Sequence, residues 1–291
     1  MHAPRATRLA FCLLILAATA AGCGPHNPPD PFDSNPVKIG FKDGRPGMSD
    51  LTSKGNYDGF EPHVAQKVFG LLQRDFTSLP VTTDNWRDAL LNGKTNHNKV
   101  DLVVADISER DELKHDFDMA GPYLQTWLGV LVKADNDEPI KKVEDLRSVP
   151  VCVQEKTTAY QTLQDAGIKP PVTATDLNGC MDRIKDGTAR AVLADYAVLQ
   201  GIAVNSGTGT QHDYKVVRDT WIGRPQYLMM MLPKGHQKAC ELLRQAIADY
   251  LQDTDWTTTL KQDLGLDDFT NEEIRNRFQP VTNATSDDCS A

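Results

Sequence analysis

The chain has 291 residues, of which 40% are hydrophobic and 24% are charged. This is the composition of a folded globular protein and excludes a disordered, collagenous or multispanning membrane protein. Asp and Glu number 40 against 31 for Lys and Arg, which gives a formal net charge of −9. Because an acidic surface repels the phosphate backbone of nucleic acids, we expect no nucleic-acid partner.

The first 22 residues have the features of a secretory signal peptide. Arg5 and Arg8 precede the apolar run 9–18, which is too short to span a bilayer. The segment Ala-Ala-Gly-Cys at 20–23 resembles the bacterial lipobox, in which a peptidase cuts before a cysteine that carries lipid, although alanine replaces the more usual leucine. We expect a signal peptide over 1–22 and lipidation of Cys23, with a plain signal peptide as the alternative.

A proline-rich polar segment, GPHNPPDPFDSNP, follows over residues 24–36. Proline lacks a backbone N–H and fixes φ, so this composition favours neither a helix nor a strand. Residues 23–36 are therefore expected to form a semi-rigid linker. The folded body would then be secreted and held at the outer face of the cell membrane by the lipid on Cys23.

Strands and helices alternate along the first part of the folded body. Strands are predicted at 37–41, 79–82 and 100–105, and helices at 62–72 and 84–92. This alternation predicts an α/β fold with a mostly parallel sheet that is covered on both faces. In such folds ligands bind at the carboxyl ends of the strands.

The second part repeats this order and ends in further helices. Strands are predicted at 149–153, 191–194 and 227–232, and helices at 157–166, 178–187, 237–251 and 256–264. The last strand contains the methionine run 229–231. It indicates a buried strand rather than a copper site, because neighbouring strand residues face opposite ways. A polar C-terminal tail is expected over 276–291.

Six short segments occur in an order that is typical of one family. They are KIGFKD at 38–43, YDGFE at 57–61, VDLVVA at 100–105, GPY at 121–123, CMDRIKDG at 180–187 and AVLAD at 191–195. In these segments the chain resembles the bacterial extracellular solute-binding proteins of family 3, of the glutamine- and glutamate-binding type that serves amino-acid ABC transporters. The similarity covers residues 37–266, and the cysteine placement resembles the actinobacterial branch.

The resemblance implies a two-lobed periplasmic-binding-protein fold of type II, each lobe a mostly parallel sheet flanked by helices. Lobe 1 would be discontinuous, and lobe 2 would be the segment between its parts, joined by two hinge strands. The implied bounds are 37–123 and 223–275 for lobe 1, 124–222 for lobe 2, and 124–128 and 217–222 for the hinges. The ligand is trapped when the lobes close. Two sequential domains are the alternative, which the late strand after Trp221 disfavours.

Four cysteines remain in the predicted mature body. They are Cys152, Cys180, Cys240 and Cys289. An even number outside the cytosol predicts disulfides, and three pairings are possible in principle. The expected lobes favour Cys152–Cys180 and Cys240–Cys289. A zinc site is the alternative, but no CxxC spacing or histidine pair supports it, so no metal and no cofactor is expected.

A free amino acid presents a carboxylate and an ammonium, so a cleft that binds it must offer a donor or cation to one and a carboxylate to the other. Asp195 matches the family aspartate that holds the α-ammonium; a helix N-cap before Tyr196 is the alternative. The family arginine that binds the carboxylate is replaced here by Leu113. Arg110 lies three residues earlier and is expected to reach the same carboxylate. The alternative is a surface ion pair with Glu109, Asp111 or Asp106.

Further candidates follow from the same resemblance. Ser108 matches the family's hydroxyl donor to the carboxylate, and Asp106 stands where a small residue is common. Thr157 and Thr158 match threonines that contact the ligand, between a strand and a helix where backbone N–H groups favour an anion. Lys156 replaces a common glycine and would add a charge for an acidic ligand side chain, with a solvated surface lysine as the alternative.

Lobe 1 contributes further positions that match residues near the cleft. They are Phe41, Asp43 and Phe60. An aromatic ring there would cover the aliphatic part of the ligand, whereas packing in the core is the alternative for both phenylalanines.

These features predict a monomeric extracytoplasmic lipoprotein that captures a small polar solute, with an amino acid favoured, and delivers it to an ABC permease in the membrane. A sensor that signals to a membrane receptor is one alternative. A dehydratase on the same fold is another, with Glu155 and Asp106 as its candidate acids. No Ser-His-Asp, zinc or phosphate-loop pattern supports catalysis, so no enzyme is expected.

Overall fold

The computed structural model describes residues 30–91, 99–137, 139–168, 172–208, 211–281 and Cys289. The predicted signal peptide, the lipidation site Cys23 and the first part of the predicted linker lie outside these residues. None of the helices in the described ranges combines the length and the apolar character needed to cross a bilayer.

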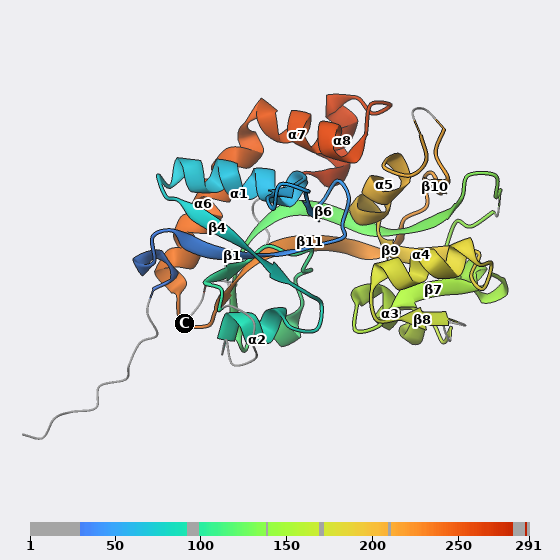
Figure 1. Ribbon diagram of the computed structural model, residues 1–291, viewed down its shortest axis with the longest axis horizontal. Coiled ribbons are helices and arrows are strands. Elements are labelled where there is room, and N and C mark those ends of the chain that lie inside the picture. Colours follow the sequence, from blue (N-terminus) through green and yellow to red (C-terminus); the bar gives the residue numbers. More distant parts are fainter. Residues whose placement is uncertain are drawn as a thin grey trace, which may run out of the picture.

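The first half of the fold is a small α/β unit. Its elements are β1 (Val37–Lys42), β2 (Asp50–Leu51), β3 (Tyr57–Asp58), α1 (Phe60–Leu71), β4 (Phe76–Val81), α2 (Trp86–Leu91), β5 (Leu102–Val103) and a short 3-10 helix, η2 (Asp111–Leu113). β1 pairs in parallel with β4 and with β5, as the alternation in the sequence predicts. Figure 1 shows α1 and α2 on opposite faces of these strands.

The second half repeats this pattern. Its elements are η3 (Val143–Ser148), β7 (Val151–Gln154), α3 (Thr158–Asp165), β8 (Val172–Ala174), α4 (Leu177–Lys185), β9 (Ala191–Asp195), α5 (Tyr196–Val204) and β10 (Tyr214–Val216). β7 pairs in parallel with β8 and with β9. Side-chain caps begin both middle helices: Thr157 accepts a hydrogen bond from the Tyr160 N–H, and Asp176 accepts one from the Gly179 N–H.

Two long strands carry the sheet from one half to the other. β6 (Phe117–Lys133) pairs antiparallel with β11 (Ile222–Pro233), and beyond Leu128 it continues alongside β9. The sheet order is therefore β4-β1-β5-β11-β6-β9-β7-β8, with β10 paired to β6. Figure 1 shows β6 and β11 running through the middle of the molecule. The structure thus has the mixed, mostly parallel two-lobed α/β architecture that the sequence predicts.

The methionine run is a buried strand, as predicted. Met229 and Met231 pack beneath α2 with Trp86, whereas Met230 lies in the cluster on the other face of the sheet. All three methionines are fully buried. Alternate residues of a strand face opposite sides, so one apolar run serves two cores.

Three helices return to the first half after β11. They are α6 (Gln237–Gln252), α7 (Thr254–Leu264) and α8 (Asn271–Phe278). The prediction of a polar tail from residue 276 is wrong at its start, because Phe278 is fully buried and its ring contacts those of Tyr196 and Trp221. The amphipathic pattern of α8 is short and mostly polar, which is why it resembles a tail in the sequence.

The predicted linker also ends earlier than expected. Residues 31–33 form a 3-10 helix, η1 (Pro31–Asp33), and the Phe32 ring packs edge-on against Phe69. Arg74 Nη1 donates a hydrogen bond to the Phe32 carbonyl oxygen at 2.6 Å. Because an apolar ring is buried here, residues 30–36 belong to the folded body.

Both predicted disulfides are present. Cys152–Cys180 joins β7 to α4 across a sequence separation of 28, and Cys240–Cys289 ties the last described residue to α6 across a separation of 49. Each bridge closes a loop within one half of the molecule. The predicted pairing is therefore confirmed.

Candidate functional site

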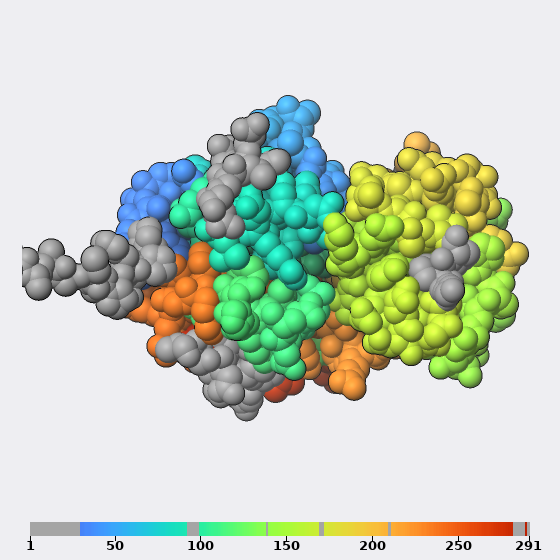
Figure 2. Space-filling model, turned by 90° about the horizontal axis from the view of Figure 1, so that it is seen from below, coloured from blue at the N-terminus to red at the C-terminus, as the bar shows by residue number. Residues whose placement is uncertain are grey.

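A polar cleft lies between the two halves of the molecule. Its inner part is a cavity of about 60 Å³ whose charged lining residues are Lys42, Arg45, Arg110, Lys156, Asp106 and Asp195. A mouth of about 760 Å³ lies beside it, between the N-terminal ends of α2 and α3. Figure 2 shows this side of the molecule, where the region of α2 meets the region of α3.

The inner cavity brings together most of the residues predicted from the sequence. They are Asp106, Ser108, Arg110, Thr157, Thr158 and Asp195. They come from the loop after β5, the start of α3 and the end of β9. These positions lie just past the carboxyl ends of strands, where open α/β sheets bind ligands.

The other predicted residues do not line this cavity. Phe41 and Phe60 are fully buried and pack against aromatic neighbours. Both are therefore core residues, which was the alternative to covering the ligand. Asp43 is exposed, and its Oδ1 accepts hydrogen bonds from two backbone N–H groups of its own loop. The structure corrects these three assignments: the rings fill the core and the carboxylate holds a turn.

Leu113 and Arg110 lie in clearly different surroundings, one in the core and the other at the cavity. Leu113 is 1% exposed and belongs to the core beneath α2, so it has no access to a ligand. The Arg110 side chain lines the cavity, and its Nη1 lies 3.2 Å from Glu112 Oε1. Its Nε is buried without a hydrogen-bond partner, and burial lowers its pKa. Arg110 forms an ion pair with Glu112, which is not one of the expected partners, and its guanidinium keeps an unused donor at the cavity.

A pair of carboxyls from opposite halves meets in the inner cavity. Asp106 follows β5 and has φ of 52°, and Asp195 ends β9. Asp195 occupies the N-cap position of α5 but makes no capping hydrogen bond, so the simple capping role is wrong. Burial, and then the charge of Asp106, raise the pKa of Asp195 well above its ordinary value.

Two cations that the sequence reasoning missed face the same pair. Lys42 is 8% exposed at the end of β1, and Arg45 is 6% exposed in the following loop. Burial lowers the pKa of Lys42, and the Asp106 carboxyl opposes this shift. Lys42 lies within the segment that carries the family resemblance, and a lysine directly after a buried strand was the available signal.

Glu61 holds the loop that carries Asp106. It is fully buried on α1, and its Oε1 accepts hydrogen bonds from the Asp106 N–H at 2.6 Å and from the Tyr123 hydroxyl of β6. Burial, followed by the charge of Asp106, raises the pKa of Glu61 to about 7. Glu61 is therefore a positioning residue, which sequence reasoning also missed.

Direct contacts join the two halves across the cleft. Gln154 Oε1 accepts from Arg45 Nη2 at 3.0 Å, and Gln154 Nε2 donates to Thr83 Oγ1 at 3.0 Å. At the mouth, Lys156 Nζ lies 2.8 Å from Asp84 Oδ1. These contacts place the halves close together. They also engage Lys156 with Asp84, although the sequence suggested a role toward the ligand.

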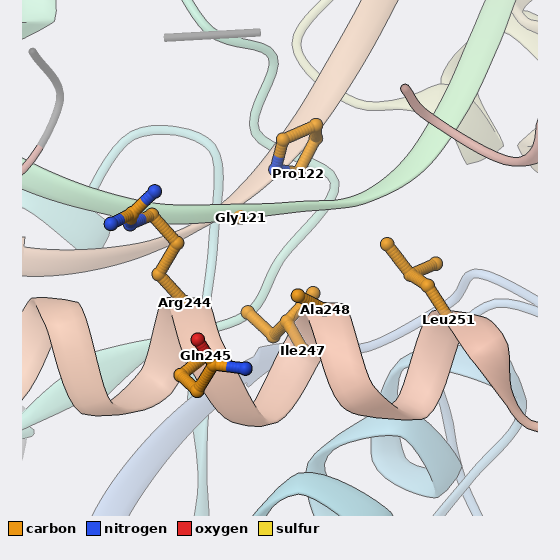
Figure 3. Close-up of a pocket in the computed structure, with 7 residues that line it drawn as sticks. All are labelled: Gly121, Pro122, Arg244, Gln245, Ile247, Ala248 and Leu251. Atoms are coloured by element: carbon orange, nitrogen blue, oxygen red, sulfur yellow. The ribbon is translucent and has the colours of Figure 1, made fainter. Parts of the chain in front are cut away.

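A second, smaller pocket lies on another part of the molecule. Figure 3 shows it between β6 and α6, with Gly121, Pro122 and residues of α6 in its wall. Its volume is about 40 Å³, and its charged residue Arg244 pairs with Glu241. Because this pocket offers no opposed charges to a polar solute, the cleft is the candidate site. Within the described ranges, no three His, Cys, Asp or Glu side chains cluster as metal ligands.

The fold and the cleft define a two-lobed α/β binding protein with a polar site between its lobes. The chain belongs to the bacterial extracellular solute-binding proteins, family 3, whose model matches residues 37–265. Membership in this family places the protein outside the cytoplasm and makes it a binder of small solutes.

Two named relatives show the range of this similarity. The glutamate-binding protein GluB of Corynebacterium glutamicum is 24% identical over 273 residues, which cover 89% of this chain and 90% of the relative. The L-cystine-binding protein TcyJ of Escherichia coli K12 is 27% identical over 115 residues, which cover 40% of this chain and 41% of the relative.

Solved structures share the fold. An ancestral arginine-binding protein bound to glutamine is 24% identical, has a TM-score of 0.65, and covers 79% of this chain and 97% of its own. An amino-acid ABC transporter substrate-binding protein from Streptococcus pneumoniae, bound to L-arginine, is 20% identical with a TM-score of 0.66, and covers 79% and 93%.

Proposed function

We propose that this protein captures a free amino acid between its two lobes and delivers it to an ABC permease. The observation that carries the proposal is the inner cavity, where carboxyls and cations from both halves meet without complete pairing. Arg45 Nε, Arg110 Nε, Asp106 Oδ1 and Asp195 Oδ1 are all buried and lack hydrogen-bond partners. Buried polar atoms are costly when unpaired, so this set supports a charged ligand.

The opposed charges fit the two poles of an amino acid. Asp195 and Asp106 would receive the α-ammonium. The α-carboxylate would lie against Arg110, Ser108 and the backbone N–H groups at the start of α3, which attract an anion. The Thr157 hydroxyl already donates to the Gln154 carbonyl oxygen at 2.7 Å, so this residue would act through its backbone.

The cations at the end of β1 favour an acidic ligand side chain. Lys42 and Arg45 line the cavity and are both largely buried, and only part of the Arg45 guanidinium is engaged, by Gln154 and the Gly44 carbonyl oxygen. The relative GluB is named for glutamate. L-glutamate is therefore the first amino acid to test.

The proposed lobe bounds are 124–222 for lobe 2 and 37–123 with 223–275 for lobe 1, which we extend by the packed residues 30–36 and 276–278. The proposed hinges are 124–128 and 217–222. The first pairs with the start of β11 and the second leads into it, and the pair Leu128–Ile222 joins them. Closure at this point would bring the strand ends of the two halves together around the solute. The protein would act as a monomer that presents its closed form to the permease.

We also propose that lipid on Cys23 anchors the mature chain to the outer face of the membrane. Cys23→Ser is expected to abolish incorporation of labelled palmitate and to release the protein into the medium of a bacterium that processes lipoproteins. Equal labelling of the variant and the parent would contradict the anchor.

Catalysis is not part of the proposal. One solved structure with the same fold, at 23% identity, is an ancestral amino-acid-binding protein that is a precursor of cyclohexadienyl dehydratase. Glu155, the first candidate acid, is exposed at the mouth and accepts a hydrogen bond from Thr173 Oγ1 at 2.8 Å. Asp106 serves the proposed ammonium site.

The proposal is tested by a thermal-shift screen of the twenty amino acids, matched amines and matched carboxylic acids. A ligand at 100 times its Kd adds about 2.7 kcal/mol of stability, which for a chain of this size raises Tm by roughly 5 to 10 °C. We expect a rise with an amino acid and none with the matched amine or acid alone. No rise with any amino acid, or an equal rise with the amine, would contradict the proposal.

A further inference from the structure

Asp106 and Asp195 form an unusual contact, because it joins two acids across the cleft. Asp106 belongs to the half built on β1 and β5, and Asp195 to the half built on β7 and β9. Both line the inner cavity and a smaller adjoining pocket of about 30 Å³. Their carboxyls lie within hydrogen-bonding contact of each other, yet the Oδ1 atom of each is buried without a donor.

The groups around the pair leave its charge unbalanced. Lys42 and Arg45 are the cations that act on both carboxyls, and Glu61 is a third acid nearby. The two other cations that line the cavity, Arg110 and Lys156, are paired with Glu112 and Asp84. The three remaining acids, fully ionised, therefore exceed the two remaining cations by one negative charge. A net buried charge is costly, so the cluster favours one additional positive charge.

That positive charge belongs between the aspartates rather than on Glu61. Glu61 Oε1 already receives two hydrogen bonds, from the Tyr123 hydroxyl and the Asp106 N–H, and both favour its ionised form. Glu61 Oε2, Asp106 Oδ1 and Asp195 Oδ1 are all buried without a partner, but of these three carboxyls only those of Asp106 and Asp195 contact each other. Two carboxylates in contact repel each other when both are ionised. One bound proton removes this repulsion and forms a hydrogen bond between them, so the pair binds a single proton strongly. Burial raises the pKa of both aspartates, which favours the protonated form of the pair.

We infer that the ligand-free closed cleft holds one proton between Asp106 and Asp195, and that the ligand ammonium displaces this proton when the solute binds. The inference rests on the proposed function, because it assigns the ammonium to the same site. On binding, the O–H bond breaks and the proton passes to the solvent, while the ammonium supplies one positive charge in its place. The net charge of the cluster stays the same.

The exchange makes solute affinity depend on pH with a defined sign. Where the pair still holds its proton, the ligand must expel it, so each unit of falling pH weakens binding by up to about tenfold. Above the apparent pKa of the pair, no proton remains and the affinity becomes independent of pH. Acidification therefore favours release of the solute.

The first test needs no ligand. The protein is labelled with ¹³C at the aspartate carboxyl carbons and its NMR spectrum is followed from pH 4 to pH 9. We expect a resonance that titrates above pH 6 in the parent and that is absent in both Asp106→Asn and Asp195→Asn. The inference fails if every aspartate resonance titrates below pH 5, or if the high-pH titration persists in Asp106→Asn.

The second test uses L-glutamate as the probe. Calorimetric titrations at pH 6.5 in two buffers of different ionisation enthalpy report the protons released. We expect release of up to one proton per L-glutamate in the parent and in the control Asp43→Asn, whose exposed side chain does not line the cavity, and none in Asp106→Asn. Binding by the parent without proton release overturns the exchange. If no amino acid binds, the proposed function fails, and the NMR titration still decides whether the aspartates share a proton.

Discussion

Asp195→Asn is expected to weaken amino-acid binding by about 2 to 4 kcal/mol, or roughly 30-fold to 1000-fold in Kd. The substitution removes the charge that faces the ligand ammonium from lobe 2 and leaves the shape of the side chain almost unchanged. The carboxyl contacts Asp106 across the cavity but makes no capping hydrogen bond to α5, so the fold of lobe 2 should change little. The measurement is calorimetry at pH 8, with the amino acid identified by the screen.

Asp43→Asn is the matched control for this prediction. Asp43 is an exposed aspartate that holds a turn through its Oδ1 and does not line the cavity. We expect its Kd to stay within about twofold of the parent value, because surface changes of this kind have small effects. An unchanged Kd in Asp195→Asn, or an equal loss in Asp43→Asn, would show that the ammonium is bound elsewhere.

Leu113→Ala and Arg110→Ala are expected to have opposite consequences. Leu113 is 1% exposed in the core beneath α2, so its truncation should lower the free energy of unfolding by about 2 to 5 kcal/mol. Its effect on Kd at a temperature where the variant is folded should be small. Denaturant unfolding, followed by calorimetric titration, separates the two quantities.

Arg110→Ala should instead weaken binding of the amino acid and leave the free energy of unfolding nearly unchanged. A lost hydrogen bond from a charged donor corresponds to about 1.5 to 3 kcal/mol, which is at least tenfold in Kd. The ion pair with Glu112 is at the surface and contributes little to folding. Normal binding by Arg110→Ala would mean that Arg110 does not replace the family arginine, and that a ligand without a carboxylate, such as a polyamine, deserves the next screen.

The site illustrates why some residues could be predicted and others could not. Asp195 directly follows a predicted strand and Thr158 begins the helix after another, and in a parallel sheet the ends of neighbouring strands meet at one edge. Phe41 and Phe60 lie at similar positions in the sequence, but a strand or helix residue can face the core or the cleft. Burial resolved that choice in favour of the core.

Glu61 shows a second limit of prediction from sequence, because its partners are far away in the chain. Glu61 lies in a segment that contributes to the family resemblance, yet its contacts are with the Asp106 N–H, 45 residues away, and the Tyr123 hydroxyl, 62 residues away. No local pattern reports such partners. The shifted pKa of Glu61 arises from desolvation, which exists only after the chain has folded around it.

The amino-acid sequence by itself determined the α/β class, the order of strands and helices, the two disulfide pairs and the candidate aspartate at the end of β9. These features depend on local periodicity, on the resemblance, or on which unit a cysteine belongs to. Tertiary structure alone decided that β6 and β11 are continuous strands, that Phe32 and Phe278 are buried, and that Lys42, Arg45, Asp106 and Asp195 share one cavity. The physical reason is that burial and charge pairing depend on contacts between residues far apart in the chain, whereas periodicity reports only near neighbours.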